Sequence, residues 1–75
     1  MEFEVSPKDQ CHVSLGDFAA DASPIGFSIE ITPNHDPEDV TAQITRLSAE
    51  YNEYELVLHV ANRSRETVSV EVQQL

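Results

Sequence analysis

The chain has 75 residues and a formal net charge of −10, from 14 acidic residues against four lysines and arginines. This length allows one small domain, residues 1–75, with a modest hydrophobic core. A negative field repels nucleic-acid backbones and membrane surfaces and attracts basic proteins, so the composition argues against direct binding to nucleic acid or to a membrane.

Cysteine content and hydropathy bear on the compartment. The single cysteine, Cys11, cannot close a disulfide within the chain, so nothing in the sequence requires an oxidising environment. The apolar runs are far shorter than a membrane span. We therefore expect a cytoplasmic protein.

Alternating apolar and polar residues near the N-terminus predict two short strands. Met1, Phe3 and Val5 alternate with glutamates, and residues 11–15 repeat the alternation after a turn at residues 6–9. Together these segments predict a hairpin. The small and polar residues that follow predict a loop over residues 16–26.

A third strand and a helix are predicted next. Residues 27–32 alternate and end before Pro33, which predicts a strand. Asp36 and Pro37 then match a helix N-cap and a first-turn proline. The apolar residues after them are spaced by four, three and four positions, as on one face of a helix, and are Val40, Ile44, Leu47 and Tyr51.

We therefore expect an amphipathic helix of about fifteen residues that begins at Asp36. The alternative for this segment is a strand over residues 40–48. Thr41 and Thr45 are β-branched, and Val40, Ala42 and Ile44 alternate with polar residues, which favours a strand. Arg46 and Ser48 interrupt this alternation and favour the helix.

Two more strands complete the expected fold. Residues 54–60 and 68–72 alternate, and the polar residues 62–66 between them predict a hairpin turn in which Asn62 tolerates a left-handed backbone. The order β-β-β-α-β-β predicts a two-layer α+β sandwich, an antiparallel sheet of about five strands covered on one face by one helix. An all-β Ig-like sandwich is the alternative, because residues 56–72 resemble the strand pairs of such domains.

Residues capable of chemistry are present but lack a catalytic or metal-binding pattern. Cys11 with His35 or His59 would supply a thiol and a base, yet a cysteine on the apolar side of a strand is typical of a core. Cys11–His12 and His35–Asp36 contain metal-ligand types, but adjacent strand residues point to opposite faces. We expect no catalytic site, cofactor or metal, and a metal- or thiol-dependent enzyme is the competing interpretation.

Two other polar groups are candidates for binding. Arg63 and Arg65 form the one dense basic spot and suit a carboxylate or phosphate, with a purely solubilising role as the alternative. His12 and His59 are predicted on the polar sheet face, where His59 would add pH sensitivity to an interface.

The acidic residues of the strands are the main candidate for function. Alternate residues on one strand face are about 6.6 Å apart, so such residues form a charged surface rather than a pocket. With His59, the predicted interaction residues are Glu2, Glu4, Glu30, Glu55 and Glu71.

The sequence thus predicts a non-enzymatic protein-binding module that acts through an acidic sheet face or an open sheet edge, as a regulator or inhibitor of a basic, nucleic-acid-binding partner. The alternatives are a nucleic-acid mimic, whose carboxylates take phosphate positions, and a small domain adapted to a saline cytoplasm. The last strand, which carries Val68, Val70 and Val72, is predicted to pair with its copy in a homodimer.

Overall fold

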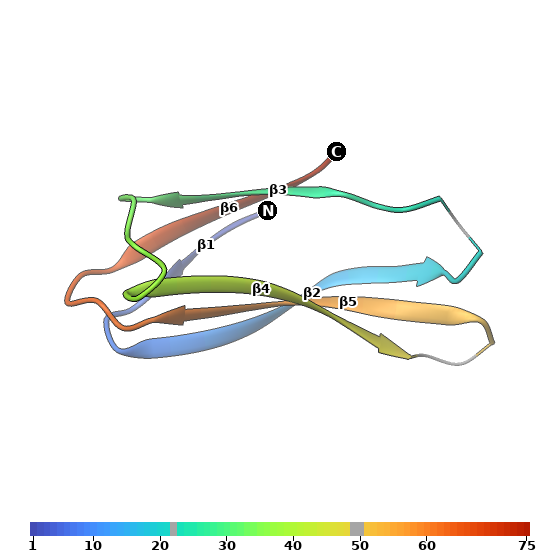
Figure 1. Ribbon diagram of the computed structural model, residues 1–75, viewed down its shortest axis with the longest axis horizontal. Helices are drawn as coiled ribbons and strands as arrows, with labels where there is room; N and C mark the ends of the chain where they lie inside the picture. Colours follow the sequence, from blue (N-terminus) through green and yellow to red (C-terminus); the bar gives the residue numbers. More distant parts are fainter. Residues whose placement is uncertain (22, 49–50) are drawn as a thin grey trace.

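The computed structural model describes residues 1–21, 23–48 and 51–75 and shows two three-stranded antiparallel sheets stacked face to face (Figure 1). The strands are β1 (Glu2–Val5), β2 (Asp9–Ala19), β3 (Phe27–Thr32), β4 (Val40–Ser48), β5 (Glu53–Asn62) and β6 (Val68–Gln74). The described residues contain no helix, and hence none that is long and apolar enough to cross a membrane. The predicted α+β sandwich with a helix is therefore wrong, and the all-β alternative fits the observed class.

The segment that begins at Asp36 forms a turn and then a strand. The carbonyl of Asp36 accepts the backbone N–H of Asp39 at 2.8 Å and that of Val40 at 3.1 Å, so the helix-start signals produce a single turn. From Val40 to Ser48 the chain pairs with β5 in an unbroken antiparallel register, which corrects the helix to the alternative strand over residues 40–48. Residues 49–50, which the predicted helix included, lie outside the described residues.

The sheets have the strand orders β1-β6-β3 and β2-β5-β4, so the predicted hairpins need correction. Strands β1 and β2 follow one another in the chain but belong to different sheets, and so do β5 and β6. Each of these connections crosses from one layer to the other (Figure 1). The strand β6 lies between β1 and β3, so both of its edges are paired and it offers no edge for the predicted homodimer.

Strand β2 is longer than expected and takes in the first part of the predicted loop. It pairs with β5 from Asp9 to Ala19, with a register shift between Ser14 and Gly16. Gly16 has a φ of 115°, a backbone conformation that residues with a side chain rarely adopt. Because glycine tolerates this conformation, the strand continues past the irregularity.

One core lies between the two sheets and is formed by the inward-facing residues of the alternating strands. Leu58 and Val60 of the central strand β5 pack against Val68, Val70 and Val72 of the central strand β6. Partly buried residues surround this centre, and they are Phe3, Cys11, Leu15, Phe27, Ile29 and Ile31. The position of Cys11 confirms its predicted role as a small core residue.

Candidate interaction surfaces

Three glutamates from three neighbouring strands form one row on the outer face of the β1-β6-β3 sheet. Glu71 of β6 lies opposite Glu2 of β1 and opposite Glu30 of β3. Strands are about 4.8 Å apart, so the carboxylates of the row are close neighbours. Glu4, which is opposite Ser69, lies on the same face. We call Glu2, Glu4, Glu30 and Glu71 the acidic face; all four are exposed.

The acidic face has polar neighbours but no cationic partner among the described residues. Ser69 Oγ donates a hydrogen bond to Glu2 Oε1 at 3.2 Å, and Gln73 Nε2 donates to Glu71 Oε1 at 3.0 Å. The one ion pair that the described residues form joins His35 and Glu66, outside this face. Like charges directly opposite on a sheet are destabilising, so the row opposes folding.

Glu55 and His59 lie on the opposite side of the molecule from the acidic face. Both belong to β5, and their side chains are on the outer face of the β2-β5-β4 sheet, where Asp17 is opposite Glu55. Ser14 Oγ donates to Glu55 Oε2 at 2.8 Å. The structure therefore brings together four of the six predicted interaction residues and places the other two on a second surface.

His12 and His59 meet across the β2–β5 ladder, on the polar face where they were predicted. Their ring centroids are 4.4 Å apart at an interplanar angle of 61°, and Gln43 of β4 flanks His59 on the other side. The Nε2 of His59 is buried without a hydrogen-bond partner. Two imidazoles fall short of a metal centre, and the described residues contain no group of three or more potential metal ligands.

Of the two arginines predicted to bind an anion, Arg63 donates to backbone carbonyls, as does the nearby Lys8, whereas Arg65 is exposed. The Arg63 guanidinium donates from Nε to the Glu38 carbonyl at 2.9 Å and from a terminal nitrogen to the Pro37 carbonyl at 3.0 Å. Lys8 Nζ donates to the carbonyl of Arg63. Arg63 thus holds the turn before β4, which leaves it poorly placed to clamp an external anion.

Next to Arg63, Asn62 is a fully buried polar residue. Its Nδ2 donates to the carbonyls of Val5 at 3.0 Å, Ser6 at 3.2 Å and Glu66 at 2.8 Å, while its Oδ1 accepts from the N–H and the hydroxyl of Ser64 at 3.0 and 2.6 Å. Asn62 is the last residue of β5 and does not have a positive φ, so its predicted left-handed turn role is wrong.

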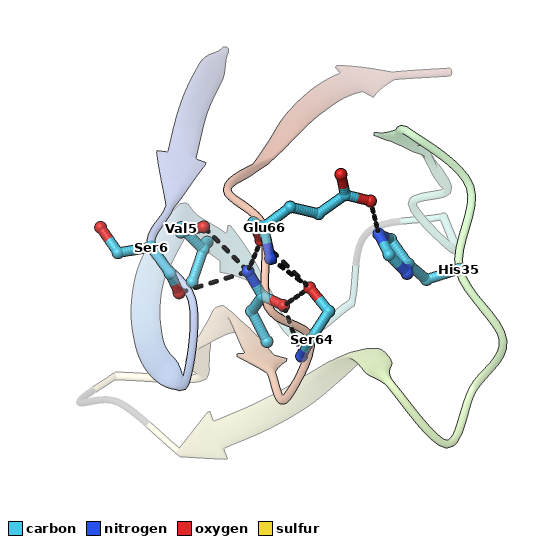
Figure 2. A network of polar contacts seen from close by, with 6 residues as sticks. Val5, Ser6, His35, Ser64 and Glu66 are labelled. Carbon is cyan, nitrogen blue, oxygen red and sulfur yellow. Dashed lines mark hydrogen bonds and ion pairs between the residues drawn. The ribbon is translucent and has the colours of Figure 1, made fainter.

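Figure 2 shows this network at the crossing from β5 to β6, with Ser64 and Glu66 close together and the Glu66 carboxylate reaching His35. Their closest atoms, His35 Nε2 and Glu66 Oε1, are 2.9 Å apart, but the pair lacks the directional geometry of a hydrogen bond. The contact is therefore an electrostatic one, present when the imidazole is protonated. Sequence reasoning missed the network, because nothing local marks an asparagine as buried.

The thiol and imidazole groups of the competing enzyme interpretation do not form one site on the β2-β5-β4 sheet. Cys11 faces the core, whereas its chain neighbour His12 pairs with His59 on the outer face. Burial raises the pKa of the Cys11 thiol, and the negative charge of Asp9 raises it further. Both effects disfavour the nucleophilic thiolate.

Comparisons with protein-family models, with curated proteins and with solved structures found no match. The proposals below therefore depend on the geometry and charge of this chain.

Proposed function

We propose that this chain is a non-enzymatic protein-binding module whose acidic face docks on a basic surface of a partner protein. The observation that supports it best is the row formed by Glu2, Glu71 and Glu30, which has one carboxylate on each strand of the sheet. No residue described in the structure supplies a cation to this row.

The energetics of the row favour an external partner. Like charges directly opposite each other on a sheet disfavour folding by an amount of order 0.2–1 kcal/mol per pair. A partner that brings lysine or arginine to the face relieves this repulsion and gains charge-assisted hydrogen bonds to carboxylates that are already exposed. The net charge of −10 adds long-range attraction for basic proteins at low salt.

A nucleic-acid mimic would use the same carboxylates in place of phosphates. The acidic face supports the general role better, because its row crosses three strands and spans only about 10 Å between its outer carboxylates. This distance is short compared with the length of a groove that binds nucleic acid. A basic partner in the cytoplasm remains the proposal, in keeping with a chain whose one cysteine is unpaired.

Affinity chromatography with matched variants tests the proposal. The wild-type chain and the double variant Glu30→Gln, Glu71→Gln are immobilised, exposed to lysate of the source cell and eluted with a salt gradient. The control is Asp17→Asn, Glu53→Gln, which makes the same change in net charge at exposed residues of the other sheet.

The proposal predicts basic proteins that the wild type and the control retain, that elute as salt rises, and that the acidic-face variant loses. Equal retention by all three forms would show that net charge alone causes binding, and would rule out the acidic face as the docking surface. Competition of a retained protein by duplex DNA would identify its nucleic-acid site as the docked surface, which is the outcome that mimicry requires.

A further inference from the structure

Strand β4 is an unblocked edge of the β2-β5-β4 sheet. Over Val40–Ser48 it pairs with β5 and with no other described strand, so one side of its backbone is free to bond. These residues include no proline, which would remove a backbone donor, and no glycine. Such an edge is a template for another strand unless charges or bulges protect it.

Charge distinguishes β4 from the other edges. Of the six strands that the structure describes, it alone has no Asp or Glu. The other edge strands carry carboxylates: Glu2 and Glu4 on β1, Asp9 and Asp17 on β2, and Glu30 on β3. In a chain with a net charge of −10, two copies therefore meet with least repulsion at β4.

The same strand exposes apolar side chains. Ile44 is 38 % exposed and Leu47 is 46 % exposed, although both are large and aliphatic. Ile44 lies opposite the core residue Leu58 and is on the inner side of the sheet, beside an exposed Ala42. The core is thus incompletely covered along β4. The one charged residue of the strand, Arg46, lies over the Tyr54 ring, with its guanidinium carbon 4.0 Å from the ring centroid.

We propose that two copies of this chain associate through β4, antiparallel about a two-fold axis, and thereby join their β2-β5-β4 sheets into one six-stranded sheet. Full overlap of residues 40–48 places Ile44 at the centre, opposite Ile44 of the second copy. In this register Arg46 faces Ala42, and no two like charges are opposite each other. The two Ile44 side chains then contact each other on the inner side of the joint, whereas Leu47 of each copy, on the outer face, lies beside Thr41 of the other.

This dimer is independent of the proposed docking function. The acidic face belongs to the other sheet and stays open, so a dimer would present two acidic faces to partners. Because each copy is strongly negative, long-range repulsion opposes association, and salt that screens it strengthens the dimer. Docking on a basic partner has the opposite salt dependence, so the two proposals fail separately.

Sedimentation velocity over a concentration series, at 50 and 500 mM NaCl, tests the dimer. The wild type is expected to shift from monomer to dimer with concentration, more completely at the higher salt. Ile44→Lys and Ile44→Glu each place like charges opposite at the centre of the joint and are expected to weaken association about tenfold or more. Ser28→Lys, at an exposed position on the edge strand β3, is the control and retains the dimer.

Mixing Ile44→Lys with Ile44→Glu tests the register. The residues at position 44 then have opposite charges, and the mixture is expected to dimerise more tightly than either variant alone. Circular dichroism verifies that both variants are folded. A wild type that stays monomeric at the highest concentration in 500 mM NaCl, or a dimer that both substitutions leave intact, would overturn the proposal, as would a mixture that stays monomeric.

Discussion

Glu71 lies directly opposite Glu2 across the β6–β1 ladder, and both side chains are on an exposed face where no described residue supplies a cation. A third glutamate, Glu30, continues the row on the other side of β6. Such a row weakens the isolated protein, and under the proposed function a basic partner would relieve the repulsion. Stability and binding are therefore expected to respond in opposite directions when the row is neutralised.

Replacement of Glu71, the central member of the row, is expected to stabilise the free protein. Glu71→Gln removes two like-charge cross-strand pairs and keeps an acceptor for Gln73, so the free energy of unfolding in urea rises by about 0.5–1 kcal/mol at low salt. Glu53→Gln, on the other sheet, makes the same charge change and is expected to have a smaller effect. An equal gain in both variants would mean that only net charge matters.

Asn62 is expected to be essential for stability. Asn62→Ala leaves three carbonyls without their side-chain donor in a buried part of the β5–β6 crossing, and the loss is about 2–4 kcal/mol of unfolding free energy. Urea denaturation measures it, with the exposed Gln73→Ala as a control that changes stability by less than about 0.5 kcal/mol. A loss as small as that of the control would show that the network contributes little.

Substitution of Gly16 is expected to destabilise the protein because of the backbone conformation at this position. A Cβ at this position would make only ordinary contacts, the nearest at 3.6 Å from the Phe18 ring, but the φ of 115° would strain any other residue. Gly16→Ala is therefore expected to lower the midpoint of thermal unfolding, with a loss of about 1–2 kcal/mol. Gly26→Ala is the control, since Gly26 lacks a positive φ. Similar midpoints for the two variants would contradict the account.

The thiol of Cys11 is expected to react as a partly buried group with a raised pKa. Burial and the charge of Asp9 raise its pKa. The rate of alkylation by iodoacetamide therefore rises at a higher pH in the folded protein than in the chain unfolded by urea. As pH rises, the Cys11 thiol loses its proton in the unfolded chain before it does so in the folded protein. The thiol's contribution to stability is therefore present below the pKa of the unfolded state and is lost as pH rises through the pKa of the folded state. An identical pH profile in both states would refute the burial of the thiol.

Much of the strand pattern could be predicted from sequence, because alternation is a local property. Residues 27–32 and 68–72 occur as strands close to the expected bounds. The helix prediction failed because Val40 and Ile44 fit both a helical stripe and a strand, and the pairing with β5 decides for the strand. Leu47, which completed the helical stripe, lies opposite Glu55 on the outer face of the sheet. Tyr51, assigned to the apolar stripe, is 92 % exposed in the β4–β5 turn.

Prediction of the candidate interaction surface from sequence was limited in the same way, because alternation is a local property. Alternation correctly places Glu30, Glu55 and Glu71 on outward-facing positions, but it does not say to which sheet each strand belongs. Sheet membership follows from long-range pairing, which put β5 opposite β6 and moved Glu55 away from the acidic face. A single-sheet prediction could not anticipate that separation.

A titration followed by nuclear magnetic resonance tests the central claim most directly. Decalysine is added to the isotope-labelled protein at about physiological salt, where the Debye length of about 8 Å leaves mainly short-range contacts. The account predicts the largest chemical-shift changes at Glu2, Glu30 and Glu71. Changes of equal size at Asp17, Glu53 and Glu55 on the other sheet would contradict the acidic face as the preferred docking surface.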